Sequence, residues 1–105
     1  FLDGEYLGSY ARVKGSADSW NTTTRSGGKY AAHETSSQVI ELARRAQAPF
    51  GLTFTTVDVV EMPDGPLVFE VSAFGGFRGL KDAVGIDAAA LYANHLIEGL
   101  STCRL

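Results

Sequence analysis

The chain has 105 residues, of which 45% are hydrophobic and 20% charged, and this composition predicts one soluble domain with a single modest core. Nine basic against twelve acidic side chains give a net charge of -3 without a basic stripe, which argues against nucleic acid or an anionic membrane surface as a partner. No apolar run reaches the length of a membrane span.

The N-terminal part of the chain is predicted to hold a turn, a strand and a long connection. Asp3-Gly4 is a strong signal for a two-residue hairpin turn, and a strand is predicted over residues 5–14. The stretch that follows, GSADSWNTTTRSGGKYAAHE, is rich in glycine and small polar residues, and only residues 29–32 favour a short strand. A connection of this length is usually functional or disordered.

A helix is predicted next. The sequence TSSQ at residues 35–38 matches a capping box in which Thr35 is the N-cap and Gln38 reaches back to it. Pro49 and Gly51 end this helix. Its apolar side chains follow helical spacing, at Val39, Leu42, Ala43, Ala46 and Phe50.

Two strands and a second helix complete the predicted fold. Residues 52–62 and residues 66–72 read as strands joined by the turn PDG, and Asp87 is the predicted N-cap of the last helix. The apolar side of that helix carries Ala90, Ala93, Ile97 and Leu100. The pattern predicts an α+β fold with an antiparallel sheet and two helices packed on one face.

The register of the hairpin decides which side chains meet on the sheet. Pro63, Asp64 and Gly65 suit a three-residue loop with a bulge at the glycine, so that Met62 faces Pro66. Counting outward, Asp58 then lies opposite Glu70, and Thr56 opposite Ser72, on one face of the sheet. A two-residue turn at Asp64-Gly65 would shift the register by one residue and place the two acids on opposite faces.

The predicted pair of acids needs a positive partner, because two neighbouring carboxylates among apolar residues repel each other. A divalent cation such as Mg²⁺ is one candidate, since oxygen ligands suit hard ions. The other candidate is an arginine or lysine that forms a structural salt bridge with them. The pairing geometry alone leaves both open.

A glycine-rich loop follows the second strand of the hairpin. Its backbone N–H groups can cradle phosphate or another anion, and Arg78 adds a fixed positive charge. The two aromatic residues of the loop, Phe74 and Phe77, are expected to pack on the sheet.

The stretch VDVVEMPDGPLVFEVSAFGGFRGLKDAVGID, residues 57–87, resembles the C-terminal signature of ATP-grasp ligases, most closely those of the RimK type. YARVK is similar to the strand of that family with a reactive-site arginine, and SWNTTTRSGGKY to its aromatic, asparagine and Gly-Gly loop. The resemblance covers nearly the whole chain. It implies that residues 1–105 form a single domain, a C-terminal fragment of a longer ATP-grasp protein without its N-terminal and nucleotide-lid segments.

The resemblance implies roles for particular residues. The metal ligands would be Asp58, Glu70 and Ser72, with Ser72 in the place of the usual asparagine. Arg12 matches the family arginine that contacts phosphate and would act in catalysis. The residues that would contact ATP or face the acceptor substrate are Arg12, Arg25, Gly27, Gly28 and Arg78.

The resemblance also implies an activity. Enzymes of this type use ATP and two Mg²⁺ ions, with Mn²⁺ as an alternative, to join a carboxylate to an amine through an acyl phosphate. The expected protein is therefore a cytoplasmic carboxylate-amine ligase, able to form a homo-oligomer. Its acceptor would be an amino acid, a peptide or a protein terminus, as in ribosomal protein modification, and the fragment alone would be inactive. The alternatives are a degenerate, non-catalytic ATP-grasp domain and an α+β binding module with salt-bridged acids.

Overall fold

The computed structural model describes residues 1–13 and 29–102 and confirms an α+β fold. The order of its elements along the chain is β1 (Tyr10–Val13), β2 (Lys29–Ala32), α1 (Ser37–Gln47), the short 3-10 helix η2 (Ala48–Phe50), β3 (Thr56–Met62), β4 (Gly65–Ser72), α2 (Arg78–Val84) and α3 (Ala88–Thr102).

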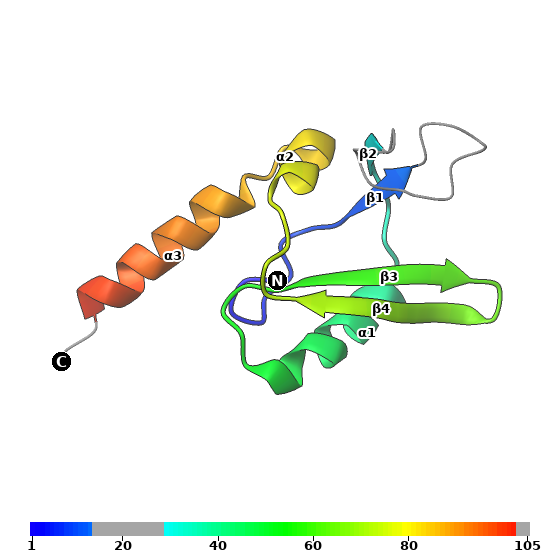
Figure 1. Ribbon diagram of the computed structural model, residues 1–105, viewed down its shortest axis with the longest axis horizontal. Helices are drawn as coiled ribbons and strands as arrows, with labels where there is room; N and C mark the ends of the chain where they lie inside the picture. Colours follow the sequence, from blue (N-terminus) through cyan, green and yellow to red (C-terminus); the bar gives the residue numbers. More distant parts are fainter. Residues whose placement is uncertain (14–28, 103–105) are drawn as a thin grey trace.

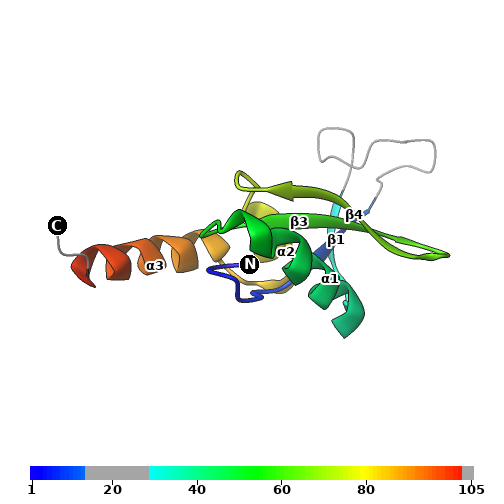
Figure 2. The ribbon, with the colours of Figure 1, turned by 90° about the horizontal axis from the view of Figure 1, so that it is seen from below.

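The strands form two antiparallel pairs, β1 with β2 and β3 with β4, where the sequence predicts one sheet. Each pair has its own helix: α1 packs against β3 and β4, and α2 packs against β1 and β2. Figure 1 shows α3 projecting away from this body, and Figure 2 shows α1 on one side of the β3–β4 hairpin. Among the described residues, no helix has the length and apolar character needed to cross a bilayer.

The turn at Asp3-Gly4 forms as predicted. Both residues have positive φ, 50° and 81°, and the backbone N–H groups of Leu2 and Glu5 each donate to the carbonyl oxygen of the other, at 2.9 and 3.0 Å. The strand predicted from Glu5 begins only at Tyr10. Residues 1–3 hydrogen-bond instead with residues 53–55, which also delays the start of β3 to Thr56.

Helix α1 is capped one residue later than predicted. Ser36 is the N-cap, and its hydroxyl accepts a hydrogen bond from the backbone N–H of Val39 at 3.2 Å. The hydroxyl of Thr35 is engaged elsewhere, with Ser9 Oγ at 2.5 Å. The predicted Thr35 cap is therefore wrong, because a tertiary contact takes the side chain that local sequence assigns to the helix.

The core is small and lies where the N-terminal segment meets α2 and α3. Its buried residues are Phe54, Leu80 and Ala88, and the partly buried residues packed on them are Leu2, Leu7, Tyr10, Ile86 and Tyr92. Under α1, Thr55 Oγ1 donates to Gln47 Oε1 at 3.2 Å, so these two buried polar side chains satisfy each other. Phe50, predicted on the apolar face of the helix, is 62% exposed because η2 follows α1 there.

Candidate functional site

The β3–β4 hairpin places Asp58 opposite Glu70 and Thr56 opposite Ser72, as predicted. The route to this register differs from the expected one. Met62 pairs with Gly65 across a two-residue turn, and the register shifts by one residue between Asp58 and Val59. Val59 pairs with Val68, so Phe69 is the extra residue of a β-bulge. The bulge cancels the shift that the short turn introduces.

Glu70 is exposed rather than buried within an apolar strand. Its neighbours Leu67 and Phe69 are 59% and 74% exposed, because α1 covers the β3–β4 hairpin only in part. Among the described residues, Glu70 forms no ion pair. Its carboxylate is therefore available to a ligand.

A pocket of about 200 Å³ contains the two acids. Its lining is supplied by β1, β3, β4 and the glycine loop: Tyr10, Arg12, Thr56, Asp58, Glu70, Ser72, Phe74, Gly75 and Gly76. It adjoins a larger cleft of about 770 Å³ whose walls also include Arg12, Asp58 and Glu70. All three predicted metal ligands and the predicted catalytic arginine thus line one small pocket.

Arg12 provides the positive charge beside the acids. Its Nη2 lies 2.6 Å from Asp58 Oδ2, and the two side chains are 40% and 34% exposed. Burial alone would lower the pKa of Arg12, but the hydrogen bond and charge of Asp58 outweigh it and raise this pKa above its usual value. Of the two positive partners that the sequence left open, the arginine is the one that contacts Asp58.

Ser72 is held by the backbone of the glycine loop. The N–H of Phe74 donates to Ser72 Oγ at 3.0 Å, an arrangement typical of a serine turn. The hydroxyl oxygen has a second lone pair and its own hydrogen for a ligand. The hydroxyl oxygen of Ser72 is therefore fixed at the wall of the pocket.

The glycine loop approaches β3 so closely that Gly75 has no room for a side chain. A Cβ there would lie 2.1 Å from Thr56 Oγ1 and 2.7 Å from Thr56 Cβ, whereas a Cβ at Gly76 would meet nothing within 4 Å. Thr56 is short and β-branched and cannot swing aside. The contact fixes the loop against the wall of the pocket.

We expect Gly75→Ala to lower the free energy of unfolding by roughly 1–3 kcal/mol through overpacking. Gly76→Ala, one residue along the same loop, should change it by less than about 0.5 kcal/mol. Urea unfolding of both variants measures the difference. Equal stabilities would show that the loop can move away from Thr56.

The donor set of the pocket fits Mg²⁺, which the family resemblance implies. Mg²⁺ prefers oxygen ligands and is usually held by one or two carboxylates together with substrate phosphates and water. Asp58 and Glu70 supply two carboxylates and Ser72 a hydroxyl. No group of three or more His, Cys, Asp or Glu side chains suited to a metal occurs among the described residues, so phosphate oxygens would have to complete the coordination.

Of the remaining predicted ligand contacts, Arg78 is the one that the structure describes, and it does not line this pocket. Arg78 opens α2, where its side chain is 82% exposed and its Nε lies 3.2 Å from Asp82 Oδ2. Arg25, Gly27 and Gly28 lie outside the described residues. Their proposed contacts with ATP or acceptor stay predictions.

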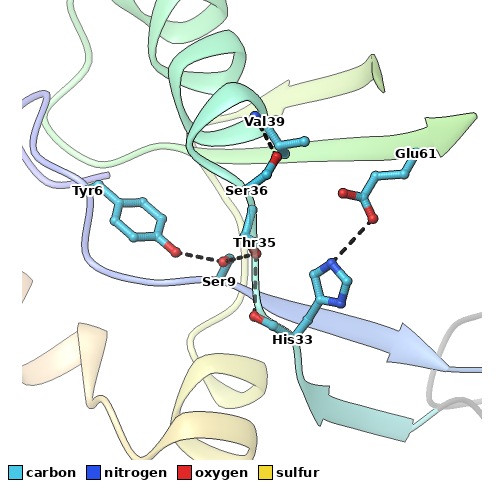
Figure 3. Close-up of polar contacts among 7 residues, drawn as sticks. All are labelled: Tyr6, Ser9, His33, Thr35, Ser36, Val39 and Glu61. Atoms are coloured by element: carbon cyan, nitrogen blue, oxygen red, sulfur yellow. Dashed lines mark hydrogen bonds and ion pairs between the residues drawn. The ribbon is translucent and has the colours of Figure 1, made fainter. Parts of the chain in front are cut away.

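Polar contacts join the segment that carries Arg12 to the parts of the chain around the hairpin (Figure 3). The hydroxyl of Tyr6 lies 2.6 Å from Ser9 Oγ, which in turn contacts Thr35 just before α1. Beyond β2, His33 Nε2 lies 3.3 Å from Glu61 Oε2 on β3. The contact of His33 with Glu61 joins the end of the β1–β2 pair to β3 and helps to hold Arg12 opposite Asp58.

Tyr10 is a site residue that the sequence analysis missed. It lines the pocket two residues before Arg12, and its ring packs edge-on against Tyr30 at a centroid distance of 5.3 Å. A Cβ at Gly79 would lie 2.2 Å from the Tyr10 ring, so the glycine makes room for it. Burial raises the pKa of Tyr10, although the charge of Arg12 opposes the shift. The alternation of side chains along β1 was the available signal.

Comparison with known proteins shows the family of this chain. The family model for the RimK-like ATP-grasp domain matches residues 1–96. A probable alpha-L-glutamate ligase of Xanthomonas euvesicatoria is 31% identical over 96 residues, 91% of this chain and 32% of the relative. Another from Xanthomonas axonopodis is 30% identical over the same shares. One from Shewanella halifaxensis is 28% identical over 84% of this chain and 19% of the relative.

The chain spans about a third of the length of the Xanthomonas relatives. Within this chain, the family match runs from the first residue through most of α3 and includes every described residue of the pocket. The chain therefore belongs to the RimK-like ATP-grasp domain family.

Proposed function

We propose that a longer protein containing this chain is an ATP-dependent carboxylate-amine ligase, and that residues 1–105 form one domain, its C-terminal metal- and phosphate-binding part. One observation carries the proposal: Arg12, Asp58, Glu70 and Ser72, from three strands, line a single pocket. Because the relatives are named probable alpha-L-glutamate ligases, we take glutamate as one of the two substrates.

The proposed reaction has two steps. A carboxylate oxygen of one substrate attacks the γ-phosphorus of ATP, which gives an acyl phosphate and releases ADP. The amine nitrogen of the other substrate then attacks the acyl carbon, phosphate leaves with the electron pair of the C–O bond, and the nitrogen loses a proton. The product is an amide.

The side chains of the pocket suit the first step. The planar fork of Arg12 can donate two hydrogen bonds to the phosphoryl oxygens, on which charge develops in the transition state. Asp58, Glu70 and Ser72 would hold Mg²⁺, or Mn²⁺ in its place, and two ions are expected; when bound, they would neutralise the phosphate charge. Arg12 would then exchange part of its contact with Asp58 for the phosphate.

Trapping with hydroxylamine tests the reaction without knowledge of the amine. Where glutamate is the carboxylate donor, we expect the full-length protein, given ATP, Mg²⁺ and glutamate, to form a hydroxamate and to release ADP in equal amount. Omission of glutamate, ATP or Mg²⁺ should each abolish the product. Hydroxamate formed without ATP would contradict an acyl phosphate. A rate of ADP release that is the same with and without every carboxylate tested would contradict it as well.

A non-catalytic ATP-grasp domain is the second candidate. The observation that favours it is the bond from Phe74 N–H to Ser72 Oγ, which occupies one lone pair of an already short ligand. That candidate predicts ATP binding by calorimetry without any release of ADP. The third candidate, a binding module, predicts no ATP binding. A cytoplasmic location, homo-oligomerisation and the use of a peptide or a protein terminus as acceptor stay predictions of the resemblance.

A further inference from the structure

The two phenylalanines of the glycine loop differ in how far they pack against the rest of the protein. Phe77 packs near Phe54 and Tyr92, at centroid distances of 5.1 and 6.5 Å. Phe74 lines the acid-containing pocket and is 96% exposed. The expectation that Phe74 packs on the sheet is therefore wrong, and the fold places a whole aromatic ring in water beside the charged residues of the site.

The backbone on both sides of Phe74 is fixed. Its own N–H donates to Ser72 Oγ at 3.0 Å, and the next residue, Gly75, lies against the Thr56 side chain. The side chain of Phe74, by contrast, is almost fully exposed. Exposure of the ring is thus a property of a positioned loop, and a ligand in the pocket could cover it without reordering the backbone.

The place of the ring limits which part of a ligand it can contact. Phe74 is two residues beyond Ser72 and four beyond Glu70, so the ring borders the point where the phosphoryl group would be transferred. In ATP the base lies a ribose and two phosphates away from that point. The face of an aromatic ring carries partial negative charge and favours apolar groups over the side-chain carboxylate of glutamate.

We propose that Phe74 is a specificity-determining residue that packs against an aliphatic or aromatic side chain of the second substrate, the partner that is joined to glutamate. The inference rests on the proposed ligase function. It assigns to this chain a preference for amino acids or peptides whose reacting end carries a large apolar side chain. A ring of this size can cover such a side chain and remove both surfaces from water.

A panel of second substrates tests the inference in the full-length protein. With glutamate and ATP constant, kcat/KM is measured for glycine, alanine, leucine and phenylalanine, each as the amide with a free amine and as the N-acetyl compound with a free carboxylate. The two forms show whether the apolar partner is acceptor or donor. Phe74→Ala should lower kcat/KM about tenfold or more for leucine and phenylalanine and less than about twofold for glycine.

Matched variants separate a contact from a general defect. Phe74→Leu should restore much of the preference, because it returns an apolar surface. Phe50→Ala removes another exposed phenylalanine, 62% exposed and outside the pocket, and should change nothing. The KM for ATP should be the same in every variant. An equal loss for glycine and leucine, or no loss for either, would overturn the inference.

A binding measurement tests the role of Phe74 even if the protein proves not to be a ligase. If the unmodified protein makes no amide with any member of the panel and also forms no hydroxamate with hydroxylamine, the ligase proposal fails on those results. Calorimetric titration of the same compounds, with ADP and Mg²⁺ present, then measures whether Phe74 contributes to their binding. Tighter binding of leucine than of glycine that disappears in Phe74→Ala supports the ring contact, and equal binding of the two by the unmodified protein refutes it.

Discussion

Glu70→Gln in the full-length protein is expected to lower kcat for ATP-dependent ligation by roughly a thousandfold, since several kcal/mol of metal and phosphate stabilisation depend on this charge. The change keeps the volume of the side chain. Glu70 is exposed and has no ion-pair partner among the described residues, so thermal unfolding should move by no more than about 1 °C. The rate and the unfolding temperature together distinguish loss of a metal ligand from unfolding of the protein.

Glu41→Gln on α1 is the matched control for that variant. Glu41 is an exposed glutamate paired with Arg44 of the same helix and lies outside the pocket, so its replacement should leave the rate unchanged. A further check varies Mg²⁺ at saturating ATP: Glu70→Gln should require a higher concentration for half-maximal rate. Turnover at the normal rate in Glu70→Gln would remove Glu70 from the mechanism.

Arg12→Lys is expected to lower kcat by about a hundredfold, the cost of losing one well-placed donor to a developing negative charge. Lysine keeps the charge but not the planar fork that can bind two phosphoryl oxygens at once. The ion pair with Asp58 is partly exposed, so its loss should cost no more than about 1 kcal/mol of stability. Single-turnover release of ADP measures the first effect and urea unfolding the second.

Arg44→Lys provides the comparison, because Arg44 also forms an ion pair with a carboxylate but lies on the outer surface of α1. It should leave the rate unchanged and the stability within about 0.5 kcal/mol of the original value. A normal rate for Arg12→Lys would mean that Arg12 serves only as the structural partner of Asp58. That result would support the third candidate function, a binding module with salt-bridged acids.

The parts of the fold that follow from local sequence were predictable. Asp3-Gly4 needs positive φ, Asp87 caps α3 by accepting from the backbone N–H of Ala90 at 3.0 Å, and β2 forms at the predicted residues. The turn and the helix cap each depend on a few neighbouring residues, whereas β2 also needs its pairing with β1. Local chemistry therefore decides the turn and the cap.

The parts that depend on distant contacts were missed. Helix α2 contains Gly79 in a glycine-rich segment and reads as loop, yet it packs on β1 and β2, where that glycine admits the ring of Tyr10. The hydroxyl of Thr35 contacts Ser9, which precedes the long connection, and Ser36 caps the helix in its place. The separation into two sheets likewise depends on which strand pairs meet in space, and no local pattern carries that information.

The same distinction holds for the candidate site. The pairing of Asp58 with Glu70 was predicted, but from a turn that the chain does not form. Tyr10 could have been found by counting back two residues from Arg12 on one strand. The exposure of Phe74 could not have been found, because it depends on the path of the loop past Thr56.

The bulge at Phe69 lets a hairpin with a two-residue turn hold the two acids opposite each other. The two-residue turn at Pro63-Asp64 offsets the strands by one residue in one direction, and the bulge offsets them by one residue in the other. A two-residue turn without the bulge would pair Asp58 with Phe69 and would place Glu70 on the other face. Deletion of Phe69 would instead remove the bulge and let Glu70 follow Val68 directly, so that Glu70 would still lie opposite Asp58. The position of the two acids therefore tolerates loss of the bulged residue, and a related chain with a regular hairpin can hold the same acids in the same place.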